Sequence, residues 1–262
     1  RNQRIEMNIS EDNNRIIIHG IKDFHPDHTF DNGQCFRWSK EADGSYTGVA
    51  FGKVVNINYF NGDVIINNAS LKDFDEHWKN YLDLERDYSV IKKTLAKNDP
   101  QMMKAISFGH GMRILCQEKW ETLISFIISQ NNNIPRIKKC IESLCTNHGS
   151  YIGEYKGKIY YGFPKMDDLA QMDAGDLSLC RLGYRANYII KAARQVALDG
   201  GKTLNSLDTA APEKAHEYLL SLTGVGPKVA NCIMLFSMRK YNSFPLDVWI
   251  KRVMNQIYSI DV

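Results

Sequence analysis

The residue best suited to covalent chemistry is Lys228, in the segment Leu222-Thr-Gly-Val-Gly-Pro-Lys-Val-Ala230. We expect this lysine in the first turn of a helix, where the helix dipole disfavours a cation. Partial burial favours the neutral amine in the same way. A neutral amine is the form that attacks an electrophilic carbon. The alternative is that Lys228 only binds phosphate.

A carboxylate, Asp247, follows in Phe244-Pro-Leu-Asp-Val-Trp249. Its ordinary role there is to cap the next helix. Beside Lys228 it would also assist deprotonation and stabilise positive charge developing on a sugar ring. The two roles are compatible.

Two helices joined by a tight corner would place this lysine. We expect one helix over 212–222 and a second that begins at Pro227, which suits the first helical position. We expect Gly224 and Gly226 to supply positive φ, and neither carries a Cβ. The unpaired N–H groups of the second helix form a phosphate site, so the pair can grip a DNA backbone without reading bases. Alone, such a corner also fits helical proteins of other functions.

The first third of the chain predicts antiparallel sheet. Asp43-Gly44 and Asn61-Gly62 are dipeptides that two-residue hairpins favour, because both turn residues need positive φ. Apolar and β-branched runs predict a meander of three or four strands at Arg15–His19, 46–51, 54–60 and 64–66.

From about Leu71 the pattern becomes helical. Phe74, Trp78 and Tyr81 fall on one helical face. Further helices are expected over 120–129, from Pro135, and over 186–197. The fold class is therefore α+β. A small antiparallel sheet domain with flanking helices (1–115) would pack on an all-helical domain (116–262) that contains the helix-hairpin-helix motif.

Composition excludes several classes of protein. The six cysteines form no C-x-x-C pair and no zinc or iron–sulfur spacing, so we expect reduced thiols, no metal and no cofactor. Residues 116–262 carry 18 Lys and Arg against 14 Asp and Glu, which permits a polyanionic partner. With no signal peptide or long apolar run, we expect an intracellular protein with no membrane partner. Met7 is a candidate natural start, with residues 1–6 as a tag remnant.

Several motifs together resemble the 8-oxoguanine DNA glycosylases of the helix-hairpin-helix Gly-Pro-Asp superfamily. They occur in the family's order from residue 32 to residue 247 and so cover most of the chain. The motifs are Asn32-Gly-Gln-Cys-Phe-Arg-Trp38, Ser129-Gln-Asn-Asn-Asn-Ile-Pro-Arg136, Tyr161-Gly-Phe-Pro164 with Leu182-Gly-Tyr-Arg-Ala186, and Leu222 to Ala230 with Pro245-Leu-Asp247.

The resemblance implies a bifunctional glycosylase and abasic-site lyase. Lys228 would attack C1′ of the damaged nucleoside and form a Schiff base, and β-elimination would then nick the strand. Asp247 would be its electrostatic partner. The implied substrate is 8-oxoguanine, and formamidopyrimidine-guanine, in duplex DNA opposite cytosine. The enzyme would act as a monomer, in the cytoplasm or nucleoid of a bacterium or the nucleus of a eukaryote.

The resemblance also assigns residues to the flipped-out state that such chemistry requires. Asn131 would fill the vacated space and Tyr184 would wedge into the base stack. Arg136 and Arg185 would donate hydrogen bonds to the orphaned cytosine. Without the family match, the arginines would be solvated surface or phosphate contacts, and Tyr184 a half-buried core aromatic.

Lesion recognition would rest on one hydrogen atom. In 8-oxoguanine N7 carries a hydrogen, which a backbone carbonyl near Gly33 could accept. On guanine the same carbonyl faces a lone pair, and a mispaired acceptor costs about 1–3 kcal/mol. Cys232 would lie against the flipped base, although alone it suggests a small core residue. Gly33 alone suggests a turn before a strand.

The sequence departs from the pattern of the 8-oxoguanine DNA glycosylases in two respects. Eukaryotic relatives place a histidine where this chain has Trp249, which leaves the DNA phosphate contact there without its imidazole. The family closes its base pocket with an aromatic residue and a glutamine on a later helix, and we assign no counterpart before Val262.

Two alternative functions stay open. One is a glycosylase for an oxidised pyrimidine or an alkylated purine. The missing four-cysteine cluster and the presence of Lys228 argue against it. The other is a non-catalytic helix-hairpin-helix module, which would need neither Lys228 nor Asp247.

Overall fold

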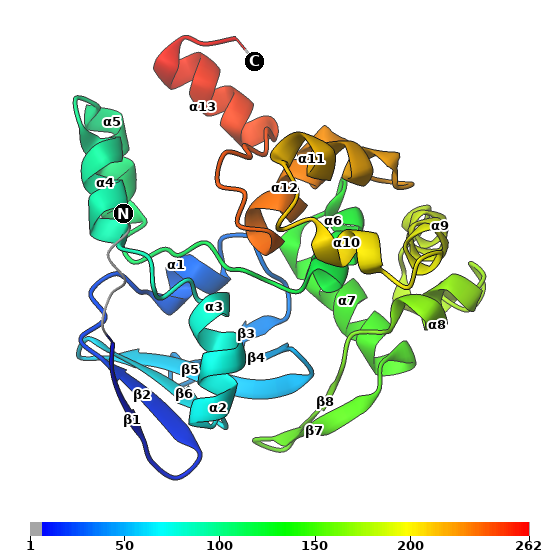
Figure 1. Ribbon diagram of the computed structural model, residues 1–262, viewed down its shortest axis with the longest axis horizontal. Helices are drawn as coiled ribbons and strands as arrows, with labels where there is room; N and C mark the ends of the chain where they lie inside the picture. The colour runs from blue at the N-terminus through cyan, green and yellow to red at the C-terminus, as the bar shows by residue number, and fades with distance from the viewer. Residues whose placement is uncertain (1–6, 262) are drawn as a thin grey trace. The chain divides into compact units, whose positions relative to one another are not determined.

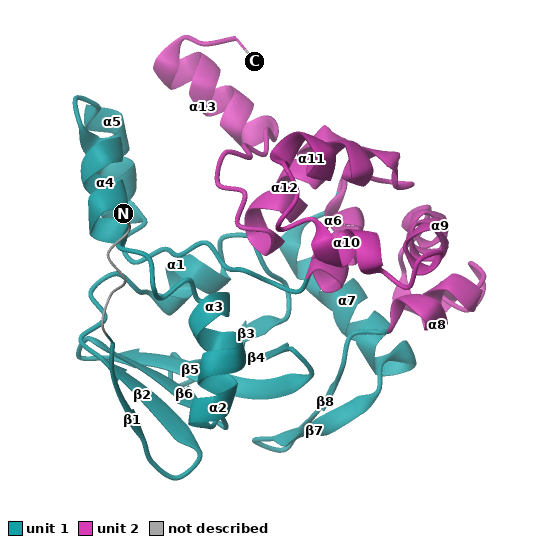
Figure 2. Cartoon of the chain, viewed as in Figure 1, with its two compact units in different colours: residues 1–118, 132–164 teal, residues 119–131, 165–262 magenta. Residues whose placement is uncertain are grey.

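The computed structural model describes residues 7–261 (Figure 1). Residues 1–6, for which we considered a tag remnant, and Val262 lie outside the described residues. The chain divides into two compact units (Figure 2). The first unit holds the residues up to 118 together with 132–164, and the second holds 119–131 and 165 onward.

A six-stranded antiparallel sheet forms the centre of the first unit. Its strands, in spatial order, are β1 (Asn8–Glu11), β2 (Arg15–His19), β6 (Asp63–Asn67), β5 (Lys53–Phe60), β4 (Tyr46–Ala50) and β3 (Trp38–Lys40). The four predicted strands are confirmed. The sequence missed β1 and β3, which are short strands at the two edges of the sheet.

The two predicted hairpin turns differ in outcome. Asn61 and Gly62 have φ of 52° and 91° and join β5 to β6 as expected. The other prediction was wrong, because only Gly44 of its pair has positive φ, at 84°. The β3–β4 connection is a longer loop in which the Asp43 carboxylate accepts the N–H of Ser45 at 3.0 Å.

Helices cover this sheet and complete its core. The predicted apolar face is confirmed, since Phe74, Trp78 and Tyr81 are all buried. The Trp38 indole donates to the Tyr81 hydroxyl at 2.7 Å and ties the helix to the sheet. The helical segments are α1 (Pro26–Phe30), α2 (Leu71–Asp73), the π-helical turn η1 (Phe74–Trp78), α3 (Lys79–Tyr81), α4 (Tyr88–Ala96) and α5 (Pro100–Phe108).

Residues 132–164 group with the sheet, whereas the sequence boundary after residue 115 assigned them to the helical domain. They form α7 (Ile134–His148) and a hairpin of β7 (Tyr151–Tyr155) and β8 (Lys158–Tyr161). The sequence predicted only helices over 116–262, and the hairpin corrects that prediction. Lys138 on α7 donates to Asp31 at 3.2 Å and to the Trp38 carbonyl at 2.9 Å. These hydrogen bonds join α7 to residues of the sheet unit.

The second unit is helical, with the apolar helix α6 at its centre. Every residue from Thr122 to Ile128 is buried, and α9 and α12 contact this helix. The predicted helices are confirmed to within two residues at each end. The helical segments are α6 (Lys119–Ser129), α8 (Met166–Gln171), the 3₁₀ turn η2 (Ser178–Cys180), α9 (Arg185–Ala197), α10 (Lys202–Ser206), α11 (Pro212–Ser221), α12 (Pro227–Ser237) and α13 (Val248–Tyr258). Within residues 7–261, no helix has the length and apolar character that crossing a membrane requires.

Candidate active site

The corner between α11 and α12 is built around Gly224. Its φ is +82°, and a Cβ there would lie 2.7 Å from Cβ of Tyr188 on α9. Glycine is therefore required both for the backbone conformation and for the close packing on α9. The N–H of Val225 donates to the Leu222 carbonyl at 3.1 Å and closes the turn.

The backbone conformation of Gly226 differs from the prediction. Its φ is −98°, so the expected positive φ was wrong. It is instead the extended N-cap residue of α12, a conformation that does not require glycine. A Cβ on Gly226 would meet no heavy atom within 4 Å. The first turn of α12 is thus open beside this residue, and its N–H groups and dipole suit an anion such as a phosphate.

Lys228 lies in the first turn of α12, as predicted, and its side chain is half-buried. Its Nζ lies 5.3 Å from the ring centroid of Phe126 on α6. The Phe126 ring in turn stacks on Phe236 at 5.7 Å. The amine therefore sits against an aromatic wall that shields one of its sides from water.

The pKa of the Cys232 thiol, one helical turn further on, responds to the charges of both Lys228 and Asp247. The residue is 2% exposed. Burial raises the pKa of its thiol, the nearby Lys228 ammonium opposes that rise, and the negative charge of Asp247 adds to it. Lys228 and Asp247 thus both act on the same sulfur.

Asp247 caps α13, as the sequence predicted. Its Oδ1 accepts the N–H of Ile250 at 2.8 Å, and the residue is half-buried. The cap fixes the carboxylate at the start of α13.

Arg185 is the centre of a hydrogen-bond network that the sequence did not reveal. The side chain is 4% exposed, and its guanidinium donates to the carbonyls of Gln130, Asn131 and Leu182. The Gln130 side chain donates to the Gly224 carbonyl at 2.8 Å. The turn at Asn131 is thereby tied to the hairpin, and the role of Arg185 toward cytosine stays a prediction.

Three predicted DNA-binding residues of the second unit are exposed. Asn131 has φ of +46° and an exposed side chain. Tyr184 is 51% exposed, with its ring 5.5 Å from that of Tyr188. Trp249 is 70% exposed, with the Arg252 guanidinium 5.0 Å from its ring.

Gly33 and Arg136 belong to the first unit. Gly33 has φ of +87° in the loop after α1. Arg136 is exposed in the first turn of α7, where the Asn133 side chain caps its N–H at 3.0 Å. Arg136 therefore presents its guanidinium to solvent.

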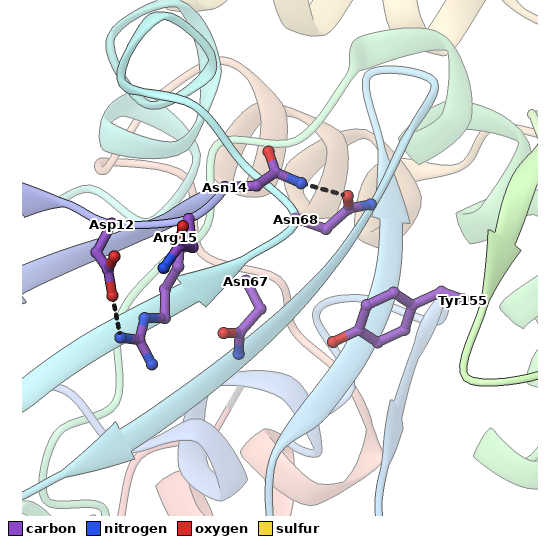
Figure 3. A pocket seen from close by; sticks show the side chains of 7 residues that line it. Asp12, Asn14, Arg15, Asn67, Asn68 and Tyr155 are labelled. Carbon is purple, nitrogen blue, oxygen red and sulfur yellow. Dashed lines mark hydrogen bonds and ion pairs between the residues drawn. The ribbon is translucent and has the colours of Figure 1, made fainter.

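A polar pocket of about 330 Å³ lies elsewhere in the first unit, and it holds none of the predicted site residues (Figure 3). Its side chains largely satisfy one another. Asn14 donates to Asn68 at 2.9 Å, and Arg15 pairs with Asp12 at 2.7 Å. We assign it to turn structure. The lining residues are Asp12, Asn13, Asn14, Arg15, Asn67, Asn68 and Tyr155.

The fold and the corner between α11 and α12 are those of a helix-hairpin-helix protein. Residues 124–262 match the HhH-GPD superfamily of base excision DNA repair proteins, and residues 16–123 match the 8-oxoguanine DNA glycosylase N-terminal domain. The chain belongs to the 8-oxoguanine DNA glycosylase family within that superfamily.

Solved structures and a curated enzyme agree with this placement. MBOgg1, solved with a low-affinity DNA ligand, is 47% identical with a TM-score of 0.94 and covers 98% of this chain and 89% of its own. The Clostridium acetobutylicum 8-oxoguanine glycosylase/lyase, solved with double-stranded DNA containing cytosine opposite 8-oxoguanine, is 42% identical with a TM-score of 0.90. That alignment covers 97% of this chain and 86% of the other.

An N-glycosylase/DNA lyase of Saccharomyces cerevisiae is 39% identical over 64% of this chain. The chain spans only 45% of that yeast enzyme. It spans 63% of an N-glycosylase/DNA lyase of Arabidopsis thaliana and 60% of a probable one of Methanothermobacter thermautotrophicus.

Proposed function

We propose that this protein is a bifunctional DNA glycosylase and abasic-site lyase that removes 8-oxoguanine, and formamidopyrimidine-guanine, from duplex DNA. One observation carries the proposal. The amine of Lys228 lies at the open start of α12, against Phe126, and Lys228 and Asp247 each act on the thiol of Cys232. The similarity to an enzyme solved on DNA with cytosine opposite 8-oxoguanine supports the substrate class.

The chemistry begins when the Lys228 ammonium releases a proton to solvent and the neutral Nζ attacks C1′ of the flipped-out nucleotide. The C1′–N9 bond breaks, and the base leaves with its bonding electrons and takes up the proton that Nζ loses. The sugar ring then opens: the C1′–O4′ bond breaks, O4′ takes up a proton from solvent, and a protonated Schiff base forms between Nζ and C1′. Loss of a proton from C2′ then expels the 3′ phosphate and nicks the strand. Asp247, held at the cap of α13, stabilises the positive charge that develops on the sugar ring.

The corner and its neighbours hold the DNA for this reaction. The open N–H groups near Gly226 bind a backbone phosphate, which fixes position without reading sequence. Asn131 and Tyr184, both exposed, occupy the space that the flipped nucleotide vacates. Every proposed group comes from one chain, so we infer that the protein acts as a monomer, inside the cell where genomic DNA lies.

Recognition of the lesion uses a carbonyl and a thiol. The Gly33 carbonyl accepts the N7 hydrogen of 8-oxoguanine, which guanine lacks. Cys232 contacts the base as a neutral thiol, because the raised pKa of its sulfur keeps the proton on at neutral pH. We assign Arg136 to the cytosine opposite the lesion, and with it Arg185, whose guanidinium keeps one N–H beyond its bonds to the carbonyls of Gln130, Asn131 and Leu182.

A lesion panel tests the proposed function. We expect single-turnover excision of 8-oxoguanine opposite cytosine to exceed that of thymine glycol or 3-methyladenine by at least about tenfold, since these bases do not offer the N7–H donor. Undamaged guanine opposite cytosine is the blank. Faster release of either rival base, or no excision from any duplex, contradicts the proposal.

Arg136→Ala tests the assignment of the opposite base. A good bidentate contact to a base is worth about 1–3 kcal/mol, so the preference for cytosine over adenine opposite 8-oxoguanine falls about tenfold. The measurement is the ratio of excision rates on the two duplexes. Lys139→Ala removes another exposed positive charge from α7 and leaves that ratio unchanged. Unchanged ratios in both variants would remove Arg136 from this role.

A further inference from the structure

Gln34, which none of the proposed steps uses, is buried in the loop after α1 and is 2% exposed. Its Nε2 donates to the carbonyls of Thr29 and Arg113, at 2.7 and 2.8 Å. Its Oε1 accepts the N–H of Leu115 at 2.9 Å. The amide thus joins α1 to the segment before α6 and uses both of its polar atoms.

The backbone of Gln34 is held as firmly as its side chain. Its N–H donates to Oδ1 of Asn32 at 3.1 Å, and Asn32 is itself anchored by a bond from Nδ2 to the His28 carbonyl at 2.9 Å. The Gln34 carbonyl accepts Nε2 of Gln117 at 2.6 Å.

These bonds have a consequence for the neighbouring glycine. The N–H of Gln34 and the carbonyl of Gly33 belong to one planar trans peptide, in which they point in opposite directions. A bond that fixes the N–H therefore also fixes where the Gly33 carbonyl points. Glycine at φ +87° would otherwise leave that plane free to rotate.

We propose that Gln34 and Asn32 are positioning residues for lesion discrimination, which they achieve by fixing the Gly33–Gln34 peptide plane. This inference rests on the proposed function, because it concerns the carbonyl that accepts the N7 hydrogen of 8-oxoguanine. A carbonyl already aimed at the lesion needs no reorientation on binding, and a rotated one loses the bond that separates 8-oxoguanine from guanine.

Two reactions of the same enzyme separate this role from a merely structural one. Excision of 8-oxoguanine requires the base contact, whereas cleavage of a preformed abasic site involves no base. In Gln34→Ala and Asn32→Ala, we expect the ratio of 8-oxoguanine excision to abasic-site cleavage to fall about tenfold, the effect of one lost hydrogen bond in a dry site.

Matched variants complete the test. Asn56, also 2% exposed, donates to Ser45 and Thr47 and accepts from Asn67 in the same unit. Asn56→Ala destabilises the unit comparably but leaves the ratio unchanged. Asn32→Asp keeps an Oδ acceptor for the Gln34 N–H but loses the bond from Nδ2 to the His28 carbonyl, so we expect it to restore the ratio in part. Because Asn32 is exposed, this pair remains informative even where Gln34→Ala does not fold.

The inference is overturned if both activities fall equally in the Asn32→Ala variant, or if Asn32→Asp behaves like Asn32→Ala. Failure of the wild-type protein to cut either substrate would instead overturn the proposed function. The two failures are therefore distinguishable.

Discussion

Lys228→Gln is expected to abolish both excision of 8-oxoguanine and cleavage at an abasic site while lesion binding persists. The amide has nearly the length of the lysine side chain but no nucleophilic nitrogen, so C1′ loses its attacking group. Single-turnover rates should fall at least about 10⁴-fold, as for other lost nucleophiles. The equilibrium affinity for a duplex with 8-oxoguanine opposite cytosine should change much less, because the phosphate contacts come from the hairpin backbone.

Lys214→Gln is the matched control, since Lys214 is an exposed lysine on α11 of the same helix pair. The Lys214→Gln variant makes the same change of charge away from Phe126 and Cys232. Its rates of excision and of abasic-site cleavage should stay within about twofold of the wild-type rates. Substantial excision by the Lys228 variant would show that this amine is not the nucleophile. An equally severe loss in the control would indicate that the charge of the helix pair, not the amine, matters.

Asp247→Asn is expected to slow excision about 100-fold while the protein stays as stable as the wild type. Asparagine caps helices about as well as aspartate, so the bond to the Ile250 N–H is kept and only the negative charge is lost. The magnitude is that of removing one preorganised electrostatic group from a reaction centre. Excision rates and thermal unfolding of the same preparations check both parts.

Asp247→Ala separates the two roles further. It removes cap and charge together, and losing such a cap costs about 1 kcal/mol of stability. If the asparagine variant cuts at the wild-type rate and only the alanine variant is slow, Asp247 is a structural cap alone and the electrostatic assignment is wrong.

Local physical chemistry explains what the sequence could predict of the site. Pro227 and the glycines before it stop one helix and begin another whatever surrounds them, so the corner and the place of Lys228 were predictable. Asp247 before an apolar segment likewise signals a cap. The error at Gly226 came from assigning it a positive φ, whereas an N-cap residue is extended, and neither its backbone nor the open space around it requires glycine.

Contacts between distant segments left no such signal. Arg185 binds carbonyls more than fifty residues away, at Gln130 and Asn131. Gln34 binds backbone groups of Arg113 and Leu115. Backbone acceptors carry no residue type, so neither network appears in the spacing of the sequence. In the fold, β1 and β3 were missed because edge strands of three or four residues are too short for an alternating pattern.

Borohydride trapping on a duplex with 8-oxoguanine opposite cytosine is the most direct test of the central claim, that the amine of Lys228 bonds to C1′. Reduction of the Schiff base would leave a stable covalent complex. Proteolysis and mass spectrometry should place the DNA adduct on the α12 peptide at Lys228, and the glutamine variant should give no complex. An adduct on another residue, or trapping that survives in the variant, would contradict the mechanism.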